Sequence, residues 1–185
     1  MYPVELTGER VILRELSPAL ASRIWPVARA EPGVFGPPGF ADTEHELRAW
    51  LKRQQDQATG PGRLHYRWAV ERRDTGDLIG STRCYIENTY ERQGSIGYAM
   101  AAAHRRRGFA LEAVTLAIAF GFDALDLHRI WATIEPDNEA SLAMIGKLGF
   151  RREGFLEKRI RVGDDDWRDA YLYATTADEW RPRSR

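Results

Sequence analysis

The clearest chemical signal in the chain is a run of three arginines followed by a glycine, Arg105-Arg106-Arg107-Gly108. The run joins a strand-like segment to a long segment whose apolar residues repeat at helical spacing. The first turn of a helix leaves backbone N–H groups without partners, and the helix dipole adds roughly half a positive charge there. Such a helix start attracts anions, arginines strengthen it, and a glycine allows close approach. The segment therefore predicts a site for a phosphorylated cofactor.

Two well-known phosphate motifs do not fit this segment. No Gly-Lys-Ser/Thr follows, as a P-loop requires, and the three spaced glycines of a dinucleotide fingerprint are missing. The arginines alone are also compatible with a solvated turn. Residues further along the chain must therefore decide between a cofactor site and a turn.

Other residues with reactive or metal-binding side chains are better explained as structural. Cys84 is the one cysteine, lies in a strand-like run and is expected in the core. Glu112 falls in the first turn of a predicted helix, where an acid favours the helix dipole. The histidines lack the spacing of metal ligands, so no metal is predicted. They are His45, His65, His104 and His128.

The periodicity of the apolar residues predicts seven strands and four helices. The strands are expected at residues 10–16, 65–72, 78–86, 93–101, 129–135, 151–161 and 167–176. The helices are expected at residues 18–30, 43–58, 107–125 and 137–148. In chain order this gives β α α β β β α β α β β, a mixed sheet with helices of the α/β or α+β kind. A length of 185 residues fits one domain, residues 1–185.

Local signals define several boundaries. Ser17 precedes a proline, which predicts an N-cap and a helix start, and Pro26 should bend or shorten that helix. Thr43 with Glu46 resembles a capping box. Gly149 is expected to end the last helix.

Three further segments carry specific expectations. Residues 65–72 alternate in the manner of a half-buried strand. Phe35 and Phe40 lie in a Gly- and Pro-rich loop, where they either line a pocket or pack beneath the loop. Residues 163–165, Gly-Asp-Asp, predict a turn between the last two strands.

The bulk composition favours a globular protein without nucleic-acid or membrane partners. Lys plus Arg and Asp plus Glu are 27 each, so a nucleic-acid binder would need local patches such as residues 105–107 and 181–185. The second patch is expected to be a solvated chain end. No run approaches the roughly 20 apolar residues of a membrane span. The first residues do not resemble a signal peptide, which predicts a cytoplasmic protein.

The residues around the arginine run resemble a known family. Arg105-x-x-Gly108-x-Ala110 matches the Gln/Arg-x-x-Gly-x-Gly/Ala signature of the GNAT superfamily of acetyltransferases. Further motifs, in order, resemble its RimJ/RimL-like N-terminal-amine acetyltransferases. They are Gly97-Tyr98, Glu112-Ala113, His128-Arg129-Ile130, Asn138 with Ser141, and Leu148-Gly149-Phe150 with Glu153-Gly154. The close resemblance covers about residues 94–156.

The resemblance implies a GNAT fold and a coenzyme A site. The fold is a mixed, mostly antiparallel sheet of about seven strands flanked by about four helices, with a splay between strands four and five. Acetyl-CoA would insert its pantetheine arm at that splay and pair with backbone near Met100 and Ala101. Asn138 would reach the pantetheine or acetyl end, and Ser141 would lie near the sulfur. The pyrophosphate would rest on the amides of Arg105, Arg106, Arg107, Gly108, Phe109 and Ala110.

The resemblance also implies N-acetyl transfer by direct attack of an amine. A backbone N–H near Ala99 or Met100 is expected to stabilise the oxyanion, a contribution of about 3–4 kcal/mol where one donor has been removed. Ser141 is the candidate general acid. The alternative for Ser141 is an ordinary hydrogen bond in the first turn of its helix.

The general base is harder to place. RimL-type members are thought to use a glutamate on the strand after Phe-x-x-Glu-Gly, but Ile160 stands at the corresponding position. Glu157 is a weak candidate, and Glu87, Asp169 or a water chain are alternatives. Each carboxylate could simply lie on the surface.

The acceptor is expected to be a protein N-terminus or a small-molecule amine. It should lie between residues 18–58, with their aromatic loop, and the 155–170 hairpin. A homodimer is possible. The alternative function is a non-catalytic module that binds coenzyme A on the same fold, because fold does not dictate activity.

Overall fold

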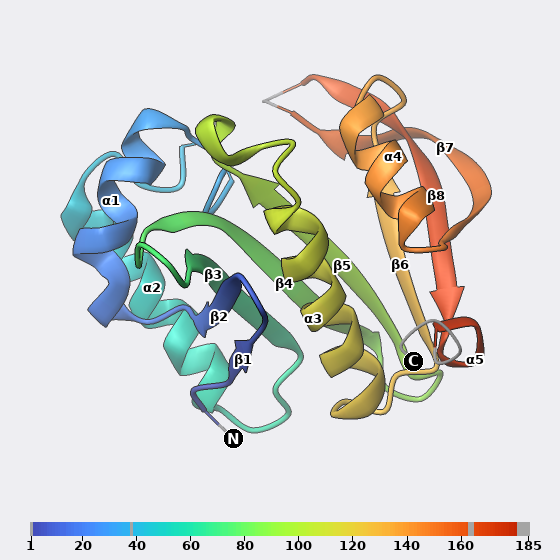
Figure 1. Cartoon of the computed structure of the whole chain (residues 1–185), viewed down its shortest axis with the longest axis horizontal. Coiled ribbons are helices and arrows are strands. Elements are labelled where there is room, and N and C mark those ends of the chain that lie inside the picture. The colour runs from blue at the N-terminus through green and yellow to red at the C-terminus, as the bar shows by residue number, and fades with distance from the viewer. Residues whose placement is uncertain (1, 38, 163–164, 181–185) are drawn as a thin grey trace. The chain divides into compact units, whose positions relative to one another are not determined.

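The computed structural model describes residues 2–37, 39–162 and 165–180 (Figure 1). Its strands are β1 (Glu5–Thr7), β2 (Val11–Glu15), β3 (His65–Arg72), β4 (Leu78–Asn88), β5 (Gln93–Met100), β6 (Arg129–Ile134), β7 (Arg151–Arg161) and β8 (Trp167–Thr176). Its helices are α1 (Ala21–Ala30), α2 (Glu44–Thr59), α3 (Phe109–Asp123), α4 (Glu139–Lys147) and α5 (Ala177–Trp180). Short 3₁₀ turns, η1 and η2, cover Pro18–Leu20 and Ala102–His104.

The strands form one hydrogen-bonded sheet in the order β1-β2-β3-β4-β5-β6-β8-β7. β5 and β6 pair in parallel, whereas the pairs β1–β2, β2–β3, β3–β4, β6–β8 and β7–β8 are antiparallel. The predicted mixed, mostly antiparallel sheet is confirmed. The predicted counts were low by β1 and α5, which have three and four residues. Elements this short carry no periodic signal.

Two compact units make up the chain. The first comprises Met1–Tyr85 and Gly97–Ile118, and the second comprises Ile86–Ile96 and Ala119–Arg185. The chain passes between them within β4, β5 and α3. A single domain over residues 1–185 stays a prediction. No helix in the described ranges is long and apolar enough to cross a membrane.

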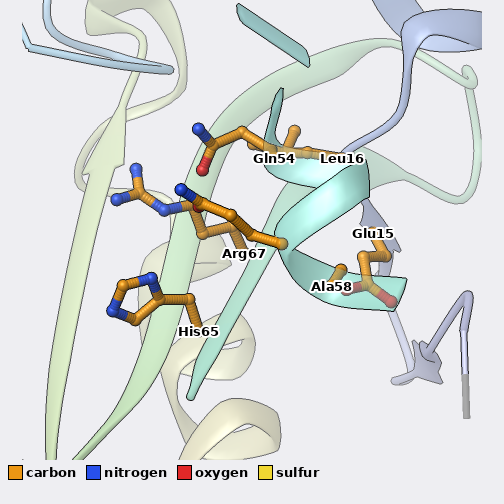
Figure 2. Close-up of a pocket in the computed structure, with 7 residues that line it drawn as sticks. Glu15, Leu16, Gln54, Ala58, His65 and Arg67 are labelled. Carbon is orange, nitrogen blue, oxygen red and sulfur yellow. The ribbon is translucent and has the colours of Figure 1, made fainter. Parts of the chain in front are cut away.

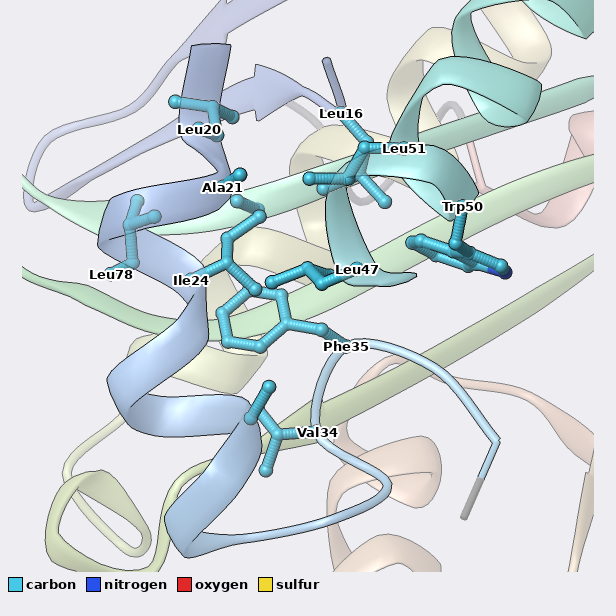
Figure 3. Packing of buried hydrophobic residues seen from close by; sticks show 12 residues of the cluster. Leu16, Leu20, Ala21, Ile24, Val34, Phe35, Leu47, Trp50, Leu51 and Leu78 are labelled. Atoms are coloured by element: carbon cyan, nitrogen blue, oxygen red, sulfur yellow. The ribbon is translucent and has the colours of Figure 1, made fainter. Parts of the chain in front are cut away.

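The core of the first unit lies between α1, α2, the loop that joins them and the neighbouring strands (Figure 3). Ile24, Leu47 and Leu51 are fully buried there. Burial of such a side chain contributes about 1.5–3 kcal/mol. Phe35 is 3% exposed and belongs to this cluster, and the Phe40 ring packs against Trp50. The loop aromatics therefore pack beneath the loop.

β3 is more deeply buried than its alternation suggested. The four residues from Trp68 to Glu71 are all buried, so both faces of the strand are covered there. Trp68 is fully buried, and its indole Nε1 donates to the carbonyl of Val4 at 3.0 Å. The prediction of the strand is confirmed, but half-burial is wrong for this stretch.

A buried carboxylate ties three elements of the first unit together. Glu71 on β3 accepts hydrogen bonds from Arg14 at 2.7 and 3.0 Å and from Arg23 at 2.7 Å. The hydrogen bonds from Arg14, followed by that from Arg23, hold the pKa of Glu71 below its usual value. Its side chain is only 9% exposed, so water screens these contacts weakly.

The predicted helix caps have different outcomes. Thr43 and Glu46 form a complete capping box, with Glu46 N donating to Thr43 Oγ1 at 3.2 Å and Thr43 N donating to Glu46 Oε2 at 3.1 Å. Ser17 makes no side-chain cap. Instead its carbonyl accepts from Leu20 N at 3.0 Å and closes η1, so α1 begins only at Ala21 and continues through Pro26.

The second unit contains the predicted elements near residues 129–176. β6 and β8 pair along their lengths, from Arg129↔Thr176 to Ile134↔Tyr171. Gly149 has φ +76° after α4, which confirms the glycine stop. Residues 163 and 164 of the predicted turn lie outside the described residues, as does the arginine-rich end at 181–185. Cys84, in the β4 segment of the first unit, is 0% exposed, which confirms the core prediction.

Candidate functional site

The start of α3 is built around a glycine that no other residue replaces easily. Gly108 has φ +84°, a conformation that L side chains rarely adopt. A Cβ at this position would also lie 3.2 Å from Nη1 of Arg10. Its carbonyl accepts from Glu112 N at 3.2 Å and begins the helix. The loop is thus shaped so that the backbone at the helix start stays open.

Three guanidinium groups gather around the first helical side chain. The Cζ atoms of Arg10, Arg72 and Arg107 lie 4.3, 5.3 and 5.4 Å from the centre of the Phe109 ring. The sequence predicted Arg107 for this site but missed Arg10, which lies just before β2, and Arg72, which ends β3. Arg72 also pairs with Asp74, so Arg10 and Arg107 carry the less compensated charge.

Arg105, the first residue of the motif, is engaged within the chain. Its backbone N donates to Ala102 O at 3.2 Å, and its side-chain Nε donates to Met100 O at 2.8 Å. Its Nη2 lies 3.4 Å from Glu31, whose carboxylate also accepts from Ala102 N at 2.8 and 3.0 Å. Arg105 therefore braces the end of β5 against the end of α1. The exposed Arg106 adopts φ +56°.

The end of β5 is held tightly by β4. A Cβ on Gly80 would lie 2.5 Å from Ala99 O and 2.6 Å from Met100 Sδ, so the close approach of these strands requires glycine. Ala101 N donates to the carbonyl of Ile79 at 2.9 Å. This contact fixes the backbone of Ala99–Ala101, which was predicted to face the cofactor.

The pairing of β5 with β6 involves the other end of β5. The parallel ladder joins Gln93 to Arg129, Gly94 to Ile130 and Ser95 to Trp131. Ala99 to Ala101 lie further along the chain. The predicted splay of these two strands stays a prediction.

Glu112 anchors the helix start to β2. Its Oε1 accepts from the backbone N of Arg10 at 2.7 Å and of Val11 at 3.3 Å. These contacts support the structural interpretation of Glu112. They also position Arg10, which reaches the ring of Phe109.

A buried polar atom lies just before the arginine run. His104 Nδ1 is buried and has no hydrogen-bond partner among the described residues. Such atoms are rare, because a lost hydrogen bond to water must be replaced. Together with the open backbone at Gly108 and the cations around Phe109, the His104 ring nitrogen makes this loop fit a phosphorylated ligand.

In the second unit, Asn138 and Ser141 lie at the start of α4. Asn138 is the N-cap, and its Oδ1 accepts from Ser141 N at 3.1 Å. The hydrogen bond of Ser141 in this turn thus comes from its backbone. Its partly buried hydroxyl makes no hydrogen bond to the part of the chain that the structure describes. The hydroxyl is therefore not committed to the helix cap.

The three carboxylates considered as bases lie in the second unit in different surroundings. Glu157 is exposed on β7. Asp169 accepts from Lys158 N at 2.9 Å, at an irregularity in the β7–β8 ladder. Glu87 accepts a short hydrogen bond from Ser95 Oγ. Of the three carboxylates, Glu157 is thus the one that accepts no such hydrogen bond from the described residues.

A separate pocket of the first unit was not predicted (Figure 2). Its lining residues are Glu15, Leu16, Gln54, Gln57, Ala58, His65 and Arg67. Burial raises the pKa of Glu15, although Val4 N and Arg63 oppose that effect. Burial lowers the pKa of Arg67. Within residues 2–37, 39–162 and 165–180, no group of three or more Asp, Glu, His or Cys residues could hold a metal ion.

Comparison with known proteins identifies the family. Residues 10–151 match the family described as the acetyltransferase (GNAT) domain. The uncharacterized N-acetyltransferase YoaA of Bacillus subtilis (strain 168) is 34% identical over 158 residues, which cover 85% of this chain and 88% of YoaA. The ribosomal protein uS5-alanine N-acetyltransferase of Escherichia coli (strain K12) is 33% identical over 87 residues, 47% of this chain and 44% of that protein.

A solved structure extends the likeness to three dimensions. Mycobacterium smegmatis RimJ in complex with CoA-disulfide has a TM-score of 0.80 and 26% identity, with 96% of this chain and 90% of RimJ covered. The family match includes every residue from Gly97 to Ser141 that the sequence marked for the cofactor. The chain therefore belongs to the GNAT family of acetyltransferases, and its activity is the transfer of an acetyl group to an amine.

Proposed function

We propose that the chain binds acetyl-CoA through the Arg105–Ala110 loop and transfers its acetyl group directly to an amine in a ternary complex. The observation that carries the proposal is the start of α3. Gly108 at φ +84° leaves the backbone open, and the guanidinium groups of Arg10 and Arg107 lie 4.3 and 5.4 Å from the ring centre of the next residue, Phe109. Helix starts of this kind bind phosphate groups.

Several residues would hold the cofactor. The backbone N–H groups of Phe109 and Ala110 and the side chains of Arg10 and Arg107 would bind phosphate oxygens. The fixed backbone of Ala99–Ala101 would hold the pantetheine arm, and Asn138 would lie near its end. When bound, acetyl-CoA supplies an acetyl group activated as a thioester.

The chain's own residues would then manage protons and orientation. Glu157 or solvent takes a proton from the attacking amine. The Ser141 hydroxyl supplies a proton to the leaving sulfur and regains one from water. A backbone N–H near Ala99 or Met100 stabilises developing negative charge on oxygen, an effect of about 3–4 kcal/mol for a well-placed donor.

The name of one relative suggests a class of acceptor. One relative is named as an alanine N-acetyltransferase of ribosomal protein uS5. The acceptor that we propose is therefore a primary amine, either the amino terminus of a protein or an amine of a small molecule. Release of coenzyme A thiol with a panel of amines tests this step. Binding of coenzyme A without any thiol release would instead favour a non-catalytic module.

The cofactor site is tested by calorimetry with coenzyme A. Gly108→Glu should weaken binding at least tenfold, because it places a negative side chain in an anion site. Gly108→Ala controls for backbone strain, which both variants share at φ +84°. Arg107→Gln should weaken binding several-fold, whereas Arg53→Gln, an exposed arginine on α2, should not. Equal affinity for Gly108→Glu and the parent would refute the site.

The role of Ser141 is tested by turnover. Ser141→Ala keeps the backbone N–H that Asn138 caps, so α4 should remain intact. We expect turnover to fall at least tenfold with little change in the affinity for coenzyme A. An unchanged turnover number removes Ser141 from the mechanism and leaves proton delivery to water.

A further inference from the structure

A cluster of cationic and aromatic side chains lies on the first unit, away from the α3 start. Arg67 on β3 and Arg83 on β4 are directly opposite one another in the strand register. Their Cζ atoms lie 4.9 and 5.5 Å from the centre of the Tyr85 ring. The His65 ring centre is 4.5 Å from that of Tyr85. We name these four residues, His65, Arg67, Arg83 and Tyr85, the Tyr85 cluster.

The two arginines of the Tyr85 cluster have no counter-charge within residues 2–37, 39–162 and 165–180. Neither has an ion-pair partner in the part of the chain that the structure describes, and Arg67 Nε is buried without a hydrogen-bond acceptor. Like charges opposite one another on neighbouring strands repel. Arg67 is partly buried and Arg83 is exposed, and removing an unpaired cation such as Arg67 from water is costly. The chain thus maintains a local positive charge that an anion would stabilise.

The nearest acid in the adjoining pocket is already committed. Glu15 is the one acidic residue in the pocket lining, and it pairs with Arg63 and accepts a hydrogen bond from Val4 N at 2.6 Å. Figure 2 shows the polar ends of Gln54, Arg67 and His65 together on one side, with Glu15 on the other. The counter-ion for Arg67 therefore does not come from this pocket.

The Tyr85 cluster borders β5, the strand that is proposed to hold the pantetheine arm. A Cβ on Gly97 would lie 2.4 Å from Cζ of Arg83, so the guanidinium packs directly on the β5 backbone. Gly97 is two residues before Ala99. Its carbonyl also accepts from Thr82 Oγ1 at 3.1 Å, which fixes the two strands at this point. An anion held by Arg83 would thus lie near Ala99–Ala101, the segment proposed to hold the pantetheine arm of acetyl-CoA.

We propose that the Tyr85 cluster binds a carboxylate of the acceptor, so that the substrate is an amine that also carries a carboxylate. The inference rests on the proposed function, because it assigns the substrate class of the same transfer reaction. Guanidinium groups bind carboxylates through paired, charge-assisted hydrogen bonds. The carboxylate belongs to a free amino acid or to an acidic residue that follows the terminal amine of a peptide.

The competing explanation is packing alone. Arg67 lies 5.8 Å from the centre of the Trp50 ring and 4.9 Å from that of Tyr85, and arginine on aromatic rings is attractive without any anion. Under that explanation Arg67 stabilises the fold but makes no distinction between acceptors. Loss of activity alone would fit either explanation. The experiment must therefore compare the activity toward acceptors with and without a carboxylate.

Matched acceptor pairs provide the comparison. L-alanine and L-alaninamide test a free carboxylate, and amidated peptides that begin Ala-Asp or Ala-Asn test a side-chain carboxylate. For at least one pair, the parent should favour the acid at least tenfold in kcat/KM, mainly through KM. Arg67→Gln and Arg83→Gln should each reduce that preference at least fivefold. Comparing the same pair in parent and variant cancels the intrinsic difference in amine basicity.

Controls separate the outcomes. Arg53→Gln should keep the parent's preference, and Arg67→Lys should restore part of it, because Lys keeps the charge but not the paired donors. Calorimetry of N-acetyl-alanine binding needs no turnover and should show at least fivefold weaker binding by Arg67→Gln. Absence of thiol release with every amine would refute the proposed function, while the calorimetry still tests the Tyr85 cluster. Equal kcat/KM for acid and amide in both pairs would overturn the inference. If the parent prefers L-alanine to L-alaninamide, equal binding of N-acetyl-alanine by parent and Arg67→Gln would also overturn it.

Discussion

The contact between Gly8 and Glu112 provides a sharp test of how the α3 start is held. Glu112 Oε1 accepts from Arg10 N at 2.7 Å and from Val11 N at 3.3 Å. A Cβ on Gly8 would lie 2.4 Å from that same oxygen and 3.0 Å from Leu116 Cδ1. Gly8→Ala must therefore displace the carboxylate and break the bonds that Glu112→Ala removes outright.

The size of the effect follows from these bonds. A hydrogen bond to a charged group contributes about 1.5–3 kcal/mol, and partial exposure here favours the lower end. Each single substitution should therefore cost about 2 kcal/mol, which is roughly 4–8 °C in Tm for a chain of this size. The double variant should cost little more than either single one, because both remove the same contacts. The coupling energy should then be about 1–2 kcal/mol.

Thermal and urea unfolding of the four proteins in this cycle measure the coupling. Independent sites add within about 0.3–0.5 kcal/mol, so strict additivity of the two losses would refute the shared-contact argument. Gly146→Ala is the matched control, since nothing lies within 4 Å of a Cβ there. Gly146 lies in the last turn of α4, so the substitution should gain at most about 0.5–1 kcal/mol. Glu112→Gln, which keeps an acceptor oxygen, should lose less than Glu112→Ala.

Three other predictions concern stability. The folded pKa of Glu71 is lowered by Arg14, so its stabilisation is present above the unfolded value of about 4.3 and is lost as pH falls through the folded value. As the pH falls below about 4.5, the urea midpoint of Glu71→Gln should therefore decrease less steeply than that of the parent. Glu44 forms an exposed ion pair with Arg48 on α2, so Glu44→Gln should keep the parent's pH dependence. Thr43→Ala should lose about 1 kcal/mol and Thr43→Ser should recover most of it, as read by Tm, and equal losses would contradict the capping box. Trp68→Phe should cost about 2–4 kcal/mol in urea unfolding, because the carbonyl that accepts from the indole is left buried without that donor, and a loss below 0.5 kcal/mol would contradict this.

Local patterns were readable from the sequence. The capping box at Thr43 and Glu46 depends on residues three apart, and it formed as expected. The arginine run and Gly108 could be placed at a helix start, because apolar periodicity defines α3 without tertiary information. These features depend on neighbours within one or two turns.

Long-range contacts were not readable. Arg10, just before β2, and Arg72, at the end of β3, reach the Phe109 ring. No local pattern specifies the register of these two strands. Glu112 was expected to favour the helix dipole, but its hydrogen bonds go to the backbone of β2. The opposition of Arg67 and Arg83 depends on the β3–β4 register, and a one-residue slip would place them on different faces.

The seclusion of Cys84 has a practical consequence for enzymology. The chain's one sulfhydryl is 0% accessible, so a colorimetric disulfide reagent should barely react with the native enzyme. A continuous assay with this reagent would then report the coenzyme A thiol that the reaction releases, and not the thiol of the enzyme. Without substrates, the rate at which the same reagent modifies Cys84 would measure transient opening of β4, because the sulfur reacts only when the strand separates from its neighbours.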